Sequence, residues 1–195
     1  MRPYFQTHLV AGLVFWATAI GWIVLEARQG AKTRAEATDS DRGSRQLIRA
    51  TLFGAWLVSF VVTADFPALA IRGDRALFFV VAMGTMWAGM ALRFWSFHTL
   101  GRYFTFTVMT STDQQVVTSG PYRWLRHPGY AGGTLATIGL GLAFGNWAAL
   151  AVMTVVPLIG VVNRIRVEEA ALLGTLGERY ATYAGGRKRL VPYLW

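Results

Sequence analysis

Two short polar segments, on either side of an uncharged stretch, hold the residues whose types and spacing could support chemistry. Arg126-His127-Pro128-Gly129-Tyr130 precedes this stretch, and Arg164, Glu168 and Glu169 follow it. An imidazole, a phenol, a guanidinium and two carboxylates can bind a polar ligand and exchange protons with it. These two segments are therefore the candidate functional site.

The length of the uncharged stretch indicates how the two segments meet. The 37 residues between Arg126 and Arg164 contain no Asp, Glu, Lys or Arg. As one helix they would extend about 55 Å, whereas the hydrocarbon layer of a membrane is about 30 Å thick. The chain must fold back, and Gly145-Asn146 is the turn-like pair near its middle. We therefore expect both polar segments at one membrane surface.

The composition is typical of a membrane protein. The chain has 195 residues, of which 54% are hydrophobic and 15% charged, which predicts one integral membrane domain over residues 1–195. The net charge of +9 comes from basic residues that bracket apolar runs, so we expect contact with membrane lipids and no nucleic-acid partner. Cysteine is absent and the three histidines lie far apart, so no metal site is expected.

The apolar runs predict an all-α, polytopic membrane fold with about five transmembrane helices, at residues 8–26, 50–71, 76–100, 129–145 and 147–165. The transmembrane core then covers residues 8–165, and residues 166–195 form a cytosolic C-terminal segment. The sequence indicates no function for the loop at residues 27–49 and does not determine the oligomeric state.

The basic residues also predict the orientation. With five spans, fifteen Lys and Arg residues fall on the side of the C-terminus and three, Arg2, Arg72 and Arg75, on the other side. Cytoplasmic loops carry the excess of basic residues. We therefore expect the N-terminus outside and the C-terminus, with the candidate site, in the cytosol.

Pro128 predicts the start of the fourth span, because proline favours the first helical position and holds the preceding residue out of helical geometry. His127 would then lie at the mouth of a helix. With Tyr130 and the free N–H groups of the helix, it could surround a ligand that carries an aromatic base and a carboxylate. The alternative is an interfacial turn anchored to lipid head groups by Arg123, Trp124 and Arg126.

Arg164 and Glu168 are spaced i, i+4 and could form an ordinary helix salt bridge, while Glu169 points about 100° away. Arg93 is expected near the same membrane level, either beside the site or with its side chain extended to the interface. Four glycines of the fourth span favour close helix packing or leave room for a ligand; they are Gly132, Gly133, Gly139 and Gly141.

These motifs resemble those of the isoprenylcysteine carboxyl methyltransferase family. Gly120-Pro121-Tyr122-Arg123 and Arg126-His127-Pro128-Gly129-Tyr130-Ala131-Gly132 are similar to its G-P-Y-R…R-H-P-x-Y-x-G signature. The C-terminal part, from Arg164 through Glu168-Glu169 and Tyr180-x2-Tyr183 to Arg189-x2-Pro192, is similar to the family's ending. The resemblance covers about residues 95–195.

The resemblance implies an enzyme dependent on S-adenosylmethionine, whose cofactor pocket is cytosolic and capped by the C-terminal segment, with Arg189 to Pro192 in the lid. The substrate would be a lipophilic small molecule or lipid from the bilayer, such as the carboxylate of an isoprenylcysteine-like compound. The resemblance assigns cofactor-binding roles to six residues: His127, Pro128, which shapes the turn, Tyr130, Gly132, Glu168 and Glu169. It assigns catalytic roles to Arg164 and Glu168.

Three alternatives remain open at this stage. A methyltransferase acting on phospholipid amines or thiols would show the same signature. An NADPH-dependent membrane reductase of the sterol-reductase type shares an H-P-x-Y-x-G element, but typically has Asn where this chain has Gly129. A non-catalytic membrane subunit is disfavoured by the intact set of polar residues.

Overall fold

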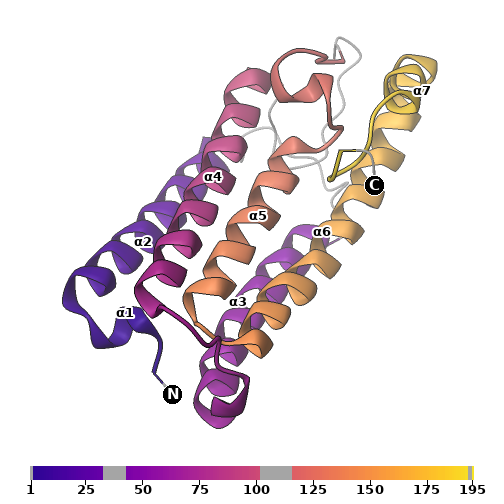
Figure 1. Ribbon diagram of the computed structural model, residues 1–195. Coiled ribbons are helices and arrows are strands. Elements are labelled where there is room, and N and C mark those ends of the chain that lie inside the picture. The colour runs from indigo at the N-terminus through magenta and orange to yellow at the C-terminus, as the bar shows by residue number, and fades with distance from the viewer. Residues whose placement is uncertain (1, 33–42, 102–115, 193–194) are drawn as a thin grey trace.

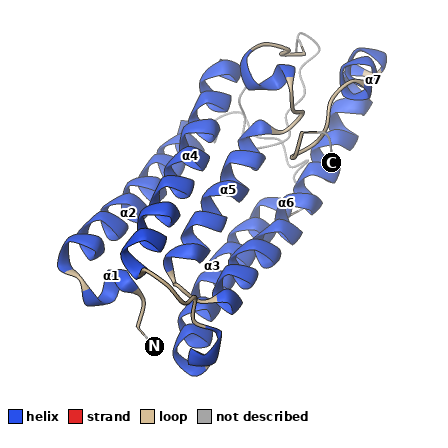
Figure 2. Ribbon diagram, in the orientation of Figure 1, coloured by secondary structure: helices blue, strands red, loops and turns tan. Residues whose placement is uncertain are grey.

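The computed structural model describes residues 2–32, 43–101, 116–192 and 195, and within them it is helical without named strands. Five long helices run lengthwise beside one another as an elongated bundle (Figure 1). They are α2 (Leu9–Lys32), α3 (Ser44–Asp65), α4 (Arg75–Leu100), α5 (Pro128–Ala143) and α6 (Trp147–Leu176). Short helices flank them (Figure 2): α1 (Tyr4–Thr7), η2 (Pro67–Leu69), η4 (Gly120–Arg123) and α7 (Glu178–Gly185). The all-α fold predicted from the sequence is confirmed.

Polar side-chain caps mark where α4 and α6 begin. The Asp74 carboxylate accepts hydrogen bonds from the first N–H groups of α4, and the Asn146 side chain does the same for α6. Gly145 precedes Asn146 with φ of +65°, a conformation that favours glycine. The predicted turn at Gly145-Asn146 is therefore confirmed as the connection between α5 and α6.

Four of the described helices are long and apolar enough to cross a membrane, namely α2, α3, α4 and α6. The remaining predicted span, the fourth at residues 129–145, corresponds to α5, which has 16 residues and extends about 24 Å. Although it is shorter than the hydrocarbon layer, α5 packs between α4 and α6 (Figure 1). Helix α6 continues without a break to Leu176, so the predicted boundary between residues 165 and 166 falls inside a helix.

Glycines allow α5 to lie against its neighbours at short distance. A Cβ atom added to Gly132 would lie 2.6 Å from the Gly89 carbonyl oxygen and 2.7 Å from the backbone nitrogen of Arg93, both in α4. On the other side, a Cβ on Gly141 would lie 3.0 Å from Cα of Leu150 in α6. Because small residues bring backbones together, α4, α5 and α6 form one tightly packed unit.

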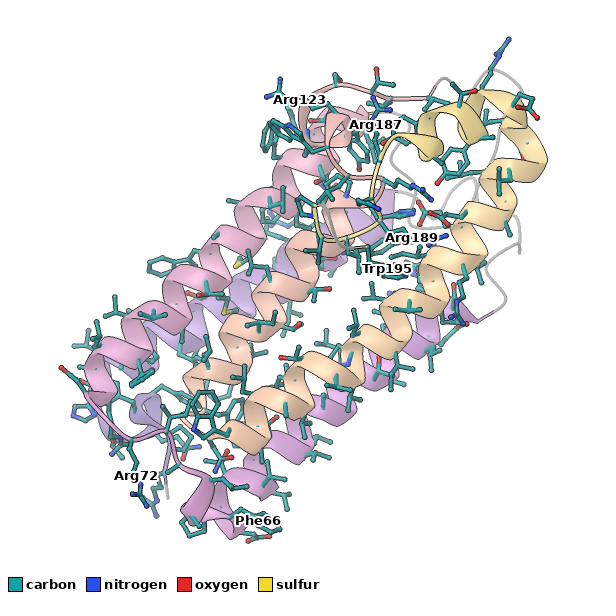
Figure 3. All side chains as sticks on the ribbon, turned by 45° about the vertical axis from the view of Figure 1, so that its right-hand side comes forward. Phe66, Arg72, Arg123, Arg187, Arg189 and Trp195 are labelled. Carbon is teal, nitrogen blue, oxygen red and sulfur yellow. The ribbon has the colours of Figure 1, made fainter. Side chains whose placement is uncertain are left out.

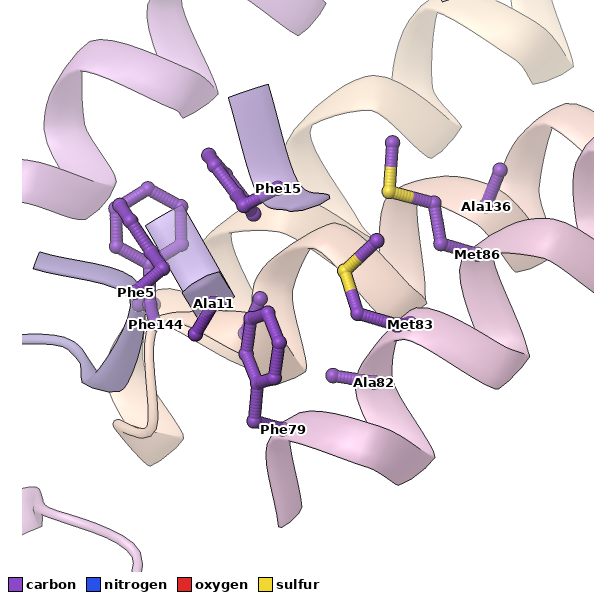
Figure 4. Close-up of a cluster of buried hydrophobic side chains, with 11 residues drawn as sticks. Phe5, Ala11, Phe15, Phe79, Ala82, Met83, Met86, Ala136 and Phe144 are labelled. Atoms are coloured by element: carbon purple, nitrogen blue, oxygen red, sulfur yellow. The ribbon is translucent and has the colours of Figure 1, made fainter. Parts of the chain in front are cut away.

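The main hydrophobic core lies around α1 and the turn between α5 and α6 (Figure 4). Phe5 stacks on Phe15 with ring centroids 3.9 Å apart, and it meets Phe144 edge-on at 5.8 Å. Met83 and Met86 of α4 complete this cluster. Such aromatic and methionine packing holds one end of the bundle together and leaves the other end for polar groups.

Basic residues lie at both ends of the bundle, as the spans predict. Phe66 and Arg72 are found at one end, and Arg123, Arg187 and Arg189 at the other (Figure 3). The connections of the chain therefore agree with the predicted alternation of spans, while the side of the membrane on which each end lies stays a prediction. Three of the counted basic residues, Arg34, Arg42 and Arg102, lie outside the described residues.

Candidate functional site

The site is built around the start of α5. Pro128 is the first residue of that helix, and His127 before it has non-helical angles, φ −126° and ψ 57°. His127 is 4% exposed. The expectation that Pro128 starts the helix and holds the imidazole at its mouth is met.

Glu169 is the ionic centre of this end of the bundle. Its carboxylate, in a residue 8% exposed, accepts hydrogen bonds from Arg126 Nη1 at 3.1 Å and from Arg189 Nε and Nη2 at 2.9 and 2.8 Å. The His127 Nε2 atom lies 3.3 Å from the same carboxylate and donates to it when it carries the proton. One buried carboxylate therefore joins α6, the segment before α5 and the C-terminal segment.

A second chain of hydrogen bonds links Glu168 to Arg164. The Tyr130 hydroxyl donates to Glu168 Oε2 at 2.7 Å and accepts from Arg164 Nε at 3.1 Å. Arg164 Nη1 donates to Ser44 Oγ of α3 at 2.8 Å, and both of these residues are buried. The two residues for which the resemblance implies catalytic roles, Arg164 and Glu168, are thus joined through the phenol of Tyr130.

The C-terminal segment closes over this end of the bundle. The backbone N–H groups of Arg126 and His127 donate to the carbonyl oxygens of Lys188 and Arg189 at 2.8 and 3.1 Å. Arg126 Nε donates to the Arg187 carbonyl at 2.8 Å. Figure 3 shows Arg187, Arg189 and Trp195 together at this end. Residues 187–189 are thus held against the residues before α5. They adjoin and overlap the segment from Arg189 to Pro192, for which the family resemblance implies a lid.

Tyr183 of α7 adds a further link between the same two segments. Its hydroxyl donates to the carbonyl oxygens of Tyr122 and Leu125 at 2.9 and 3.2 Å. Burial raises the pKa of Tyr183 to about 12, an effect that nearby Arg187 and Arg126 oppose. The phenol therefore remains a neutral donor, and its role is structural.

Five of the predicted site residues lie in these two hydrogen-bonded groups, namely His127, Tyr130, Arg164, Glu168 and Glu169. Gly132 is not part of either hydrogen-bonded group. A Cβ atom added to it would meet the backbone of α4. The structure therefore gives Gly132 a packing role, and its contact with a cofactor stays a prediction, as do the roles of the other residues.

Arg93 belongs to a separate group of contacts. Two guanidinium nitrogens pair with the carboxylate of Glu26 in α2, one of them at 2.9 Å, and Nη1 donates to the Gly129 carbonyl at 2.9 Å. The guanidinium also lies over the Phe97 ring, 4.7 Å from its centroid. Arg93 therefore supports the first turn of α5 and ties α2 to α4.

Sequence reasoning missed several partners of the site. Ser44, which accepts a hydrogen bond from Arg164, belongs to no recognisable motif and lies 120 residues away in the chain. Arg126 was visible as the first residue of its motif, but its ion pair with Glu169 was not foreseen. Within the ranges that the structure describes, no group of three or more His, Cys, Asp or Glu side chains is placed to hold a metal ion.

Comparisons with known proteins point to one family. The model of the isoprenylcysteine carboxyl methyltransferase family matches residues 80–174. A protein-S-isoprenylcysteine O-methyltransferase from Tribolium castaneum is 29% identical over 144 residues, covering 72% of this chain and 50% of the relative. The one from Xenopus laevis is 32% identical over 140 residues, covering 71% and 46%.

A solved structure is also similar. The eukaryotic intramembrane Ras methyltransferase, an isoprenylcysteine carboxyl methyltransferase, matches with a TM-score of 0.62 at 27% identity. The match covers 75% of this chain and 52% of that one. The chain spans about half the length of the curated relatives that it matches.

Proposed function

Because this chain belongs to the isoprenylcysteine carboxyl methyltransferase family, we propose that it transfers a methyl group from S-adenosylmethionine to a lipophilic acceptor in the membrane. One observation carries the proposal. The two polar segments that flank α5 and α6 come together as a buried, hydrogen-bonded site at one end of the bundle. Family membership favours this reaction over that of an NADPH-dependent reductase.

The residues of the site fit such a cofactor. S-adenosylmethionine carries an ammonium, a carboxylate and two ribose hydroxyls, and it supplies both the methyl group and its leaving group. Glu168 presents an acceptor for hydroxyl and ammonium groups, and His127 and Tyr130 add an imidazole and a phenol. Glu169 contributes through the contacts that hold His127, Arg126 and Arg189 in place. We assign Glu168, His127 and Tyr130 to the cofactor. The contribution of the protein is then mainly to align the reactants and exclude water.

Arg164 is assigned to the acceptor. It lies one turn nearer the middle of α6 than Glu168, its Nε and Nη1 atoms are held by Tyr130 and Ser44, and a guanidinium binds carboxylates well. A carboxylate acceptor, as in an isoprenylcysteine, has no proton to lose. This reaction therefore needs no general base, and orientation of the carboxylate is the main requirement.

Phospholipid amines and thiols are the second candidate class of acceptor. Glu168 favours them to some extent, because its side chain is 29% exposed and only one of its oxygens is bound by Tyr130. Its carboxylate can take the proton that an amine or thiol must lose. We also propose that the site faces the cytosol, as the distribution of basic residues predicts.

The test uses the purified protein in nanodiscs. Calorimetry should show binding of S-adenosylmethionine and none of NADPH. Methyl-labelled cofactor should then label an S-prenylated cysteine with a free carboxylate, and the amide analogue serves as the matched control. Labelling of a phospholipid amine in place of the carboxylate would select the second class. Binding of NADPH without binding of S-adenosylmethionine would refute the proposed methyltransferase function.

A further inference from the structure

The two tyrosines of α7 differ in how their hydroxyl groups are satisfied. Tyr183 donates to two carbonyl oxygens, as described above. Tyr180, one turn earlier, is 4% exposed, and its buried hydroxyl has no hydrogen-bond partner among the described residues. The two rings are neighbours, with centroids 6.0 Å apart. The contrast therefore concerns the hydroxyl of Tyr180 and not the packing of its ring.

A buried hydroxyl without a partner is destabilising, because it has lost its hydrogen bonds to water. A phenylalanine would fill the same space without that cost. Such groups are rare in folded proteins, and each calls for an explanation. One explanation is that a bound ligand supplies the missing hydrogen-bond acceptor, and the surroundings of Tyr180 support it.

Those surroundings are the candidate site. Burial is the largest cause that raises the pKa of Tyr180, and the charges of Glu169 and Glu168 raise it further, while Arg126 opposes them. The Tyr180 ring lies beside that of Tyr183, whose hydroxyl donates to the carbonyl of Leu125, the residue before Arg126. The phenol therefore lies next to the segment that carries Arg126 and His127. Gly177, with φ of +52°, turns the chain after α6 so that α7 packs back against that helix.

The position of α7 also indicates which ligand is involved. Tyr180 packs beside Tyr183, whose hydroxyl binds the carbonyls of Tyr122 and Leu125, and both α7 and that segment lie beyond the long helices. Arg164, which we assign to the acceptor, lies within α6, one turn nearer its middle than Glu168. A polar ligand that arrives from water meets the side with Tyr180 first, whereas a lipophilic acceptor arrives through the bilayer.

We propose that Tyr180 is a further cofactor-binding residue, whose hydroxyl donates a hydrogen bond to an acceptor atom of S-adenosylmethionine. This inference rests on the proposed function. It assigns to α7 a direct contact with the ligand, in addition to the closure of the site by the C-terminal segment.

The experiment compares Tyr180→Phe with Tyr183→Phe, each purified in nanodiscs. Calorimetry measures the affinity for S-adenosylmethionine and for S-adenosylhomocysteine, and thermal unfolding is followed with and without ligand. We expect Tyr180→Phe to bind about three- to tenfold more weakly, which corresponds to one lost hydrogen bond. Its unfolding temperature without ligand should equal or exceed that of the wild type.

Tyr183→Phe should behave in the opposite way, with a lower unfolding temperature without ligand, because two carbonyl oxygens lose their donor. If Tyr180→Phe binds both ligands with wild-type affinity, the inference is wrong. It is also wrong if Tyr180→Phe loses as much stability as Tyr183→Phe, because the hydroxyl would then have a protein partner. Failure of the wild type to bind S-adenosylmethionine would instead reject the proposed function.

Discussion

The hydroxyl oxygen of Tyr130 accepts a hydrogen bond from Nε of Arg164 at 3.1 Å, and this contact joins the first turn of α5 to the middle of α6. The same hydroxyl donates to Glu168. One phenol therefore fixes the guanidinium that we assign to the acceptor and the carboxylate beside it. Together with the Ser44 contact to Arg164, this hydroxyl orients the groups that we assign to the reaction.

Tyr130→Phe should therefore reduce turnover more than it reduces the amount of folded protein. Removing the hydroxyl leaves Arg164 and Glu168 each without one partner, which costs about 1–3 kcal/mol of stability. We expect kcat to fall at least tenfold, because Arg164 loses one of the contacts that orient its guanidinium. The measurement is methyl transfer at saturating cofactor, with Tyr4→Phe at the opposite end as the control. A wild-type kcat for Tyr130→Phe would show that the link is dispensable.

Glu169→Gln should loosen the C-terminal segment. The amide keeps the size of the carboxylate but loses the charge that holds Arg126, His127 and Arg189. We expect faster hydrogen exchange at the backbone amides of Arg126 and His127, which donate to residues 188 and 189. The affinity for S-adenosylmethionine should fall at least tenfold.

The control for Glu169→Gln is Glu178→Gln, which removes an exposed carboxylate at the start of α7. This variant should leave both hydrogen exchange and affinity unchanged. Equal effects of the two substitutions would mean that net charge matters and the buried contacts do not.

Gly132→Ala should destabilise the protein even without any ligand. The added Cβ would lie 2.6 Å from the Gly89 carbonyl oxygen, so α4 and α5 must separate. Overpacking of this kind typically costs about 1–3 kcal/mol. Gly84→Ala is the matched control, because nothing lies within 4 Å of its Cβ position, and it should be neutral or slightly stabilising. A loss of cofactor affinity at unchanged stability would restore Gly132 to the binding residues.

The arrangement of the helices was predictable because the thickness of a bilayer limits the length of an apolar helix that crosses it. An uncharged stretch too long for one span has to fold back, and Gly145-Asn146 was the turn-like pair near its middle. This argument alone brought the segments at His127 and Glu168 to one end. It needed no knowledge of packing.

The partners of the site residues were not predictable in the same way. The i, i+4 rule paired Arg164 with Glu168, whereas the structure inserts Tyr130 between them and makes Glu169 the ionic centre. Such choices depend on which face of α6 meets α5, and helix rotation has little signal in a uniformly apolar stretch. Ser44 had no signal, because a serine in a polar loop has many ordinary uses.

The ion pair between Glu26 and Arg93 should be strongly coupled. Both side chains are largely buried, with 23% and 14% exposure, in helices that cross an apolar environment. Removing one partner leaves a charge without compensation, which typically costs about 3–5 kcal/mol when a pair is fully buried. We therefore expect Glu26→Gln or Arg93→Met to lower the unfolding temperature more than the double substitution does. Additive effects in this double-mutant cycle would mean that the pair contributes nothing to the first turn of α5.

Single cysteines should establish the orientation, since the natural chain has none and needs no background substitutions. Arg72→Cys places a thiol at one end of the bundle, and Lys188→Cys places one in the C-terminal segment, between Arg187 and Arg189 at the other end (Figure 3). Both positions are exposed. In intact cells a membrane-impermeant maleimide should label position 72 and spare position 188, and permeabilisation should make position 188 reactive. The prediction follows from the excess of basic residues at the end that holds the site. The reverse labelling pattern would place the site outside, where a cofactor made in the cytosol does not reach it, and the proposed reaction would then be untenable.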